Sequence, residues 1–224
     1  MASEVSRVAV ITGVRTEAAC LPGTSVHCSG ADTDRAEALV ARLVAEGATA
    51  LVSFGLAGGL DPALRPGDLL LPDKVCFEDG TVLPVHAGWR AALLERGLRA
   101  VGGRILASRG VVADPAAKRC LFDCTGAGAV DMESGAVARS GLPFVVLRAV
   151  ADPADRAIPA AALAGVGPDG AVRPAAVALR LLAAPWQLPA LLRLATDSRA
   201  GLEALRGAVA GTPLDPPPFE DRKP

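Results

Sequence analysis

The chain contains few of the residues that would indicate a metal site, a disulfide framework or a nucleic-acid surface. It has two histidines, His27 and His86, and its five cysteines are an odd number at scattered spacings. Its 23 lysines and arginines nearly balance 24 aspartates and glutamates, which leaves a net charge of −1 and no basic footprint. We therefore expect reduced, partly buried thiols, no metal and no nucleic-acid partner.

The sequence also has no tyrosine, so any aromatic stacking contact has to come from its five phenylalanines or two tryptophans. The first 14 residues contain a short apolar run that is typical of a first strand, and they have no long apolar segment or cleavage site of a secretory signal. A cytoplasmic location is the default expectation. With 51% hydrophobic and 21% charged residues, the chain predicts one globular domain over residues 1–210 and a proline-rich tail over 211–224.

Strand and helix patterns alternate along the first two thirds of the chain. Continuous apolar runs at 7–14, 50–55 and 143–149 are typical of strands buried on both faces of a sheet. Residues 33–46 have helical periodicity, and Gly47 ends the helix. The pattern predicts an α/β fold with a mixed, largely parallel sheet. Further strands are expected at 67–77, 103–112 and 127–131, and further helices at 88–100, 114–122 (with Asp114 as N-cap) and 132–140.

The C-terminal part, residues 158–210, is apolar and helical. Its segment 175–195 has apolar residues on most faces, but two arginines and two prolines within it argue against a membrane span. Two shorter helices are expected instead, divided at Pro185. Their apolar surface favours core packing and a homo-oligomer interface. The alternative is a peripheral membrane contact near Trp186 that admits a lipid-bearing substrate.

Two carboxylates stand where an open α/β sheet places its ligands. Glu133 lies at the start of a predicted helix, and Asp152 follows the last apolar strand. A turn of small residues is expected after the strand at 50–55, where backbone N–H groups can approach a ligand closely. That turn comprises Gly55, Ala57, Gly58 and Gly59.

Three segments together resemble the nucleoside phosphorylase and methylthioadenosine/adenosylhomocysteine nucleosidase superfamily. They are VITGVRTE at 10–17, FGLAGGLDPALRPGD at 54–68 and VDMESGAVARSGLPFVVLRAVADPAD at 130–155. The later segment PWQLPALLRLATDSRAGLEALR resembles the hopanoid-associated phosphorylase branch. The resemblance implies a three-layer phosphorylase-type fold with no metal or organic cofactor, although inorganic phosphate is a possible co-substrate.

The activity that the resemblance implies is cleavage of the N-glycosidic bond of an adenine nucleoside, by a glycosyltransferase or an N-glycosyl hydrolase. In the hopanoid branch the substrate is adenosylhopane. One alternative is a methylthioadenosine/adenosylhomocysteine nucleosidase of nucleoside salvage. Another is a catalytically silent nucleoside-binding or membrane-associated scaffold.

The resemblance also implies roles for single residues at the base and the sugar. Asp152 is the expected acid that protonates purine N7, and Ala151 stands where the superfamily commonly has serine, which leaves open what orients the carboxyl group. Glu133 is expected to accept hydrogen bonds from the ribose hydroxyls, and Met132 to pack on the sugar. Phe122 is a candidate for stacking on the base.

The nucleophile depends on residues at the other end of the chain. Glu17 stands near the position where the hydrolytic branch has a water-activating glutamate, although Ala18 also fits that position. Arg15 and Gly13 are possible phosphate ligands. Water and phosphate therefore both remain open. Arg148, four residues before Asp152, is expected to form a structural ion pair rather than to bind a ligand.

Overall fold

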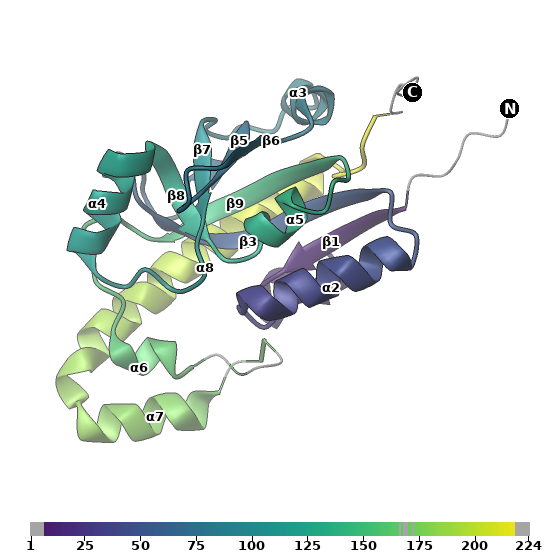
Figure 1. Ribbon diagram of the computed structural model, residues 1–224. Coiled ribbons are helices and arrows are strands. Elements are labelled where there is room, and N and C mark those ends of the chain that lie inside the picture. Colours follow the sequence, from purple (N-terminus) through teal and green to yellow (C-terminus); the bar gives the residue numbers. More distant parts are fainter. Residues whose placement is uncertain (1–6, 166, 168–169, 172, 218–224) are drawn as a thin grey trace, which may run out of the picture.

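A nine-stranded mixed sheet forms the centre of the described residues, which are 7–165, 167, 170–171 and 173–217 of the computed structural model (Figure 1). Its strands follow the order β2-β1-β3-β8-β7-β5-β6, and β9 pairs with β3 and β4. Most pairings are parallel, which confirms the predicted mixed, largely parallel sheet. The strands are β1 (Val8–Thr12), β2 (Val26–Cys28), β3 (Ala50–Gly59), β4 (Leu69–Leu70), β5 (Lys74–Phe77), β6 (Val82–Pro84), β7 (Arg104–Ala107), β8 (Ala127–Asp131) and β9 (Phe144–Asp152).

Helices cover both faces of this sheet, so the fold has the expected three layers (Figure 1). Side chains of β9 alternate between the two faces: Phe144 and Val146 pack with α2 and α5, whereas Val145 and Leu147 pack with α3 and α8. This is why the strand reads as one continuous apolar run. The helices are α1 (Arg15–Ala18), α2 (Thr33–Ala45), α3 (Ala87–Glu95), α4 (Pro115–Thr125), α5 (Ser134–Ala138), α6 (Ala160–Leu163), α7 (Pro174–Ala183), the 3₁₀ helix η1 (Pro185–Gln187) and α8 (Leu188–Gly211).

The parallel pair β3–β9 brings two predicted site segments to the same edge of the sheet. The pairing runs from Leu51 opposite Phe144 to Ala57 opposite Val150, and after a bulge Gly58 lies opposite Asp152. The small residues expected to form a turn therefore belong to β3, and that prediction is wrong. Glycine is uncommon in strands, but here the pairing of these residues with β9 and β8 determines that they form a strand.

The C-terminal helices meet at a sharp bend. No single helix among the described residues has the length and apolarity to cross a membrane, and α7 makes an angle of 119° with the helix that follows it. The two shorter helices divided at Pro185 are confirmed. The later part of α8 packs on the sheet, where Leu205 is fully buried.

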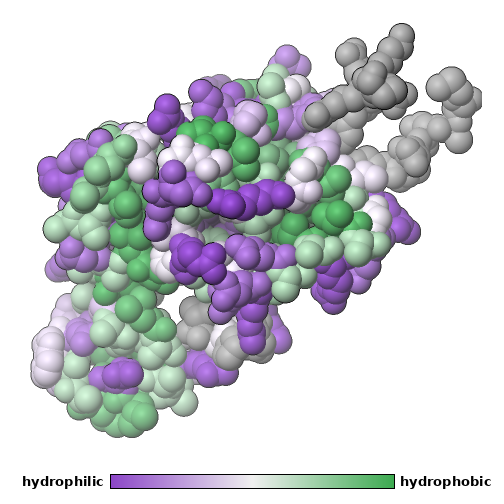
Figure 2. Space-filling model, in the orientation of Figure 1, coloured by the Kyte–Doolittle hydropathy of each residue, from purple (hydrophilic) through white to green (hydrophobic). Residues whose placement is uncertain are grey.

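Around the bend, large apolar side chains face outward, and we call this surface the apolar corner. Leu182 is 83% exposed and Trp186 is 74% exposed. Figure 2 shows this apolar surface over α6 and α7, which project from the body of the molecule. The corner comprises Leu163, Leu179, Leu182, Trp186, Leu188 and Leu192.

The start of the proline-rich tail lies along α3 in an extended conformation. Trp89 Nε1 donates to the carbonyl of Leu214 at 3.1 Å, and Arg96 Nη1 donates to the carbonyl of Asp215 at 2.8 Å. These bonds fix the tail's path through residue 215. The rest of the predicted tail, 218–224, lies outside the described residues, as do parts of the segment 158–174.

Candidate active site

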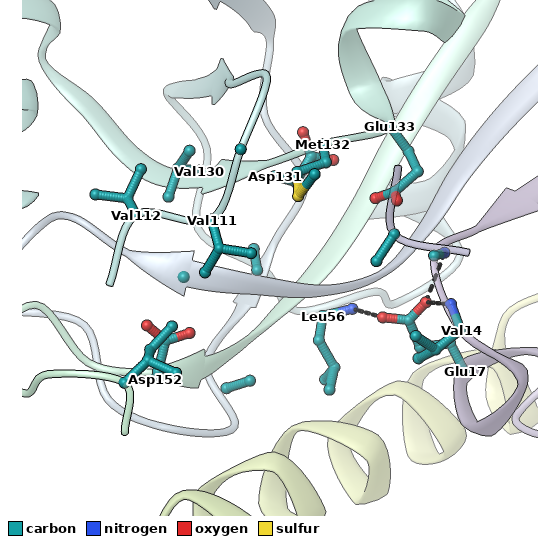
Figure 3. A pocket seen from close by; sticks show the side chains of 17 residues that line it. Val14, Glu17, Leu56, Val111, Val112, Val130, Asp131, Met132, Glu133 and Asp152 are labelled. Carbon is teal, nitrogen blue, oxygen red and sulfur yellow. Dashed lines mark hydrogen bonds between the residues drawn. The ribbon is translucent and has the colours of Figure 1, made fainter. Parts of the chain in front are cut away.

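A cavity of about 260 Å³ opens where β3, β8 and β9 end and where the chain leaves β1 (Figure 3). It is lined by seven residues that the sequence predicted for the site. Most of the remaining lining is apolar and comes from residues such as Leu56, Val111, Val112, Val130 and Ile158. The predicted residues in the lining are Gly13, Glu17, Ala57, Gly58, Met132, Glu133 and Asp152.

Arg148 of β9 organises the acidic groups at one end of this cavity. Its side chain is fully buried, and Nη2 lies 2.5 Å from Asp131 Oδ2 and 3.1 Å from Glu133 Oε2. The same nitrogen donates to Ser53 Oγ at 2.7 Å. Burial alone would lower the pKa of Arg148, but Asp131 and Glu133 outweigh it and raise that pKa. The expected structural ion pair is confirmed, and it holds a predicted substrate-binding residue in place.

Glu133 follows β8 at the start of α5, with its carboxylate beside the end of β1. Ser29 Oγ donates to Glu133 Oε1 at 2.9 Å. The pKa of Glu133 is raised to about 7: burial raises it most, Asp131 and Glu17 add to the rise, and Arg148 and Ser29 oppose it. Two oxygens held in this way can accept hydrogen bonds from a pair of neighbouring hydroxyl groups.

Glu17 projects from α1 into the same end of the cavity and is almost completely buried. Its Oε2 atom accepts hydrogen bonds from the backbone nitrogens of Gly13 at 2.8 Å and Val14 at 3.0 Å, and Oε1 accepts one from Leu56 at 2.8 Å (Figure 3). Burial raises the pKa of Glu17, while Arg148 and the three backbone donors oppose that rise. Three backbone donors thus hold the carboxyl group of Glu17, and among the described residues no side chain forms an ion pair with its oxygens.

Gly55 makes room for Glu17 inside β3. Its φ is +151°, and a Cβ atom at this position would lie 2.6 Å from both Glu17 Cδ and Arg148 Nη1. A side chain would therefore clash with both groups, so the glycine is required by their close approach.

Asp152 lies at the other end of the cavity, where β9 ends (Figure 3). Its Oδ2 atom accepts a short hydrogen bond from Lys118 Nζ on α4. The pKa of Asp152 is raised to about 6: burial raises it most, Lys118 lowers it through its positive charge and its hydrogen bond, and Asp197 adds to the rise. A carboxyl group with this pKa is suited to donate a proton near neutral pH.

Three predicted site residues are not brought into the cavity lining. Phe122 packs with Leu60 and Leu106 in an apolar cluster beside α4, where burial of its ring explains its position. Arg15 is exposed at the start of α1 and is not among the residues that line the cavity. Gly59 pairs with Ala129 of β8. The roles assigned to these three residues stay predictions.

Comparisons with known proteins identify the family of this chain. The family model of the phosphorylase superfamily matches residues 18–183. This chain belongs to the phosphorylase superfamily. A curated relative, the 5'-methylthioadenosine/S-adenosylhomocysteine nucleosidase of Geobacillus kaustophilus, is 34% identical over 130 residues, which cover 46% of this chain and 54% of the relative. The chain thus spans about half the length of the curated relatives it matches.

Solved structures of the superfamily share the fold. The nucleosidase from Neisseria meningitidis in complex with methylthio-immucillin-A has a TM-score of 0.64 and 19% identity, with 91% of this chain and 99% of that chain covered. The futalosine hydrolase of Helicobacter pylori has a TM-score of 0.65 and 17% identity, with 93% and 99% covered. At these identities the likeness establishes the phosphorylase-superfamily fold.

Two polar residues of this superfamily member escaped the sequence analysis. Lys118 contacts Asp152, and it was missed because a lysine within a helix is usually exposed. Ser29 contacts Glu133, and nothing in its surrounding sequence distinguishes it from other loop serines.

Among the described residues, no group of three or more histidine, cysteine or acidic side chains is placed to hold a metal ion.

Proposed function

We propose that this protein hydrolyses the N-glycosidic bond of an adenine nucleoside and releases adenine. The observation that supports this proposal is the separation of acidic groups in one cavity: Asp152 lies at one end, and Glu17 and Glu133 lie at the other (Figure 3). A nucleoside has its base and its ribose at opposite ends. One carboxyl group is therefore placed for the base and two for the sugar and its nucleophile.

The proposed reaction uses the three acids in different roles. Glu133 accepts hydrogen bonds from the ribose hydroxyls. The C1'–N9 bond breaks with its electron pair moving to the base, and Asp152 donates its proton to N7, so neutral adenine leaves. Water forms the new bond to C1', and Glu17 accepts the proton that this water loses. The enzyme returns to its starting state when Glu17 loses that proton and Asp152 regains one.

Water is favoured over phosphate because the anion-binding donors of this cavity are already occupied. The backbone nitrogens of Gly13, Val14 and Leu56 form a cluster of the kind that binds an anionic oxygen. All three donate to the carboxylate of Glu17. A phosphate dianion at this place would lose those donors and meet a like charge. The names of the curated relatives, which are nucleosidases, support the same reading.

Methylthioadenosine is the first substrate to test, because the curated relatives are named for it and for adenosylhomocysteine. We expect the purified protein to release adenine from methylthioadenosine, and chromatography measures the adenine that is released. Asp152→Asn should lose release and keep nucleoside binding. Asp114→Asn, on an exposed N-cap outside the cavity, serves as a control that keeps full activity. Adenine release that is unchanged in Asp152→Asn would refute the acid role, and nucleoside binding with no release by the wild type would indicate a silent scaffold.

A second candidate substrate is an adenosine that carries a large apolar group, such as adenosylhopane. The observation that favours it is the apolar corner, which begins beside the site. A hollow next to the cavity is lined by Asp152 together with Ala190 and Leu194 of α8, and α8 continues into the corner. An apolar substituent, or the membrane that contains it, would cover Leu182 and Trp186.

Surface substitutions test this candidate better than truncation, because the later part of α8 belongs to the core. We expect Leu182→Ser with Trp186→Ser to lower turnover of a lipid-bearing adenosine in vesicles and to leave methylthioadenosine turnover unchanged. Val82→Ser, at an exposed apolar residue on β6, is the matched control. An equal effect on both substrates would contradict the candidate. A change from oligomer to monomer in the double variant would assign the corner to a second copy of the chain.

A further inference from the structure

Lys118 is the only buried residue of helix α4, and its side chain is completely shielded from solvent. Its Nζ atom donates to Asp152 Oδ2, to the carbonyl of Pro153 at 3.0 Å and to the carbonyl of Arg156 at 3.2 Å. All three hydrogens of an ammonium group therefore have an acceptor. Such a buried charge is costly unless it is paired in this way.

The pairing leaves the two oxygens of Asp152 in different situations. Lys118 takes Oδ2, whereas Oδ1 makes no hydrogen bond to the described residues, and Asp152 lines the cavity. Gly58 on β3 leaves room beside this carboxyl group, because a Cβ atom there would lie 3.3 Å from both of its oxygens. One oxygen is thus held by the lysine and the other remains for a ligand.

We infer that Lys118 is a positioning residue for Asp152, which holds Oδ2 so that Oδ1 meets the leaving base and which stabilises the carboxylate left after proton donation. The inference rests on the proposed function. The preceding position holds Ala151, which left open what orients the Asp152 carboxyl group. Lys118 is the group that the inference assigns to this task. Lys118 acts through Asp152 and does not touch the substrate.

The other charges around Asp152 cannot replace the lysine. Asp197 of α8 faces Asp152 and favours its protonated form. Arg156 is held in an ion pair with Asp197 at 2.5 Å, and Arg193 of α8 lines the neighbouring hollow. The charged groups Glu17, Asp131, Glu133 and Arg148 lie at the cavity's other end. Lys118 is therefore the cation that makes Asp152 a stronger acid, and its removal should raise the pKa of that carboxyl group.

The test measures kcat and KM for methylthioadenosine against pH in Lys118→Met, Lys118→Gln and Lys118→Arg. Activity falls at alkaline pH when Asp152 loses its proton, so in the Met and Gln variants this fall should move to higher pH. Their maximal kcat should drop about tenfold or more because the acid is weaker, with little change in KM. Lys118→Arg keeps the charge and should keep the fall near its wild-type position. Lys74→Met, at an exposed lysine on β5, should behave as the wild type.

A purely structural lysine would give a different result. The melting temperature of the Gln and Met variants would fall, while the alkaline side of the pH profile stayed in place, and that outcome would overturn the inference. If Lys118→Gln is the only one of these variants that folds, its pH profile alone tests the inference. If the wild type releases no adenine, the proposed function fails. The pKa of the Asp152 carboxyl group, measured by nuclear magnetic resonance in the wild type and Lys118→Gln, then tests the lysine's effect directly: a rise supports it and an unchanged pKa refutes it.

Discussion

Glu17 Oε1 lies 2.8 Å from the backbone nitrogen of Leu56, although the two residues are 39 positions apart in the chain. The bond ties the short helix α1 to the middle of the sheet. It also completes a set of three backbone donors around one carboxylate. In the proposed function, ionised Glu17 takes up the donors that could otherwise bind a phosphate oxygen, and this relationship directs the proposed reaction towards water.

Glu17→Gln tests that relationship with little change in shape. The amide cannot take a proton from water, so we expect kcat for adenine release to fall about a hundredfold or more, with a smaller change in KM. The measurement is steady-state release of adenine from methylthioadenosine. Glu46→Gln, at an exposed helix end, is the control. Full activity in Glu17→Gln would show that another group activates the nucleophile.

The pH dependence of kcat/KM should be a narrow bell. Activity requires ionised Glu133, whose pKa burial raises to about 7, and protonated Asp152, whose pKa burial raises to about 6. Activity therefore rises as Glu133 loses its proton and falls as Asp152 loses its own, and the maximum lies between the two values. Glu133→Gln should leave an acid side that depends on Glu17 alone, and Lys118→Gln should move the alkaline side to higher pH. A profile that is flat across this range in the wild type would contradict the assignment.

Gly55→Ala should disrupt both folding and activity. The methyl group would meet Glu17 and Arg148, and the φ of +151° disfavours any side chain, so we expect a loss of about 1–3 kcal/mol in the free energy of unfolding. Gly80→Ala is the matched control, because its φ is +84° but nothing lies within 4 Å of the added atom. Urea denaturation compares the two variants. Equal losses would show that backbone conformation alone, and not the contact with Glu17, requires glycine at position 55.

Arg148→Met should be among the most destabilising substitutions in the chain. It leaves Asp131 and Glu133 buried without their cation, which costs about 3–5 kcal/mol. The exposed pair of Arg199 and Glu203 provides the comparison, and Arg199→Met should leave the denaturation midpoint unchanged. If the two variants had similar midpoints, the acids around Arg148 would not depend on it for their burial.

Much of the fold follows from sequence patterns because its central strands are long and apolar. The apolar runs around Val52 and Val146 predicted strands that are covered on both faces. The side chains of these two valines are fully buried. The Asp114 N-cap is also confirmed, since its side chain accepts from Ala117 N at 2.9 Å. Short edge strands such as β2 and β6 were not predicted, because three half-buried or exposed residues carry no periodic signal.

The site was predictable where acids follow strands and unpredictable where tertiary contacts select a residue. Glu17, Glu133 and Asp152 all line the cavity as expected. Lys118 was missed because its burial depends on how α4 packs against the end of β9, which helical periodicity does not reveal. Phe122, which was predicted to stack on the base, packs against an apolar cluster, and helical periodicity cannot distinguish these two surroundings for a phenylalanine.

The most direct test of the central claim is to identify the sugar product formed from methylthioadenosine in isotopically labelled water, with and without inorganic phosphate. The proposed function predicts that adenine is released equally fast in both conditions, and that mass spectrometry finds the free sugar carrying one labelled oxygen. Adenine release that depends on phosphate, with a sugar 1-phosphate as product, would contradict the account and assign the nucleophile to phosphate.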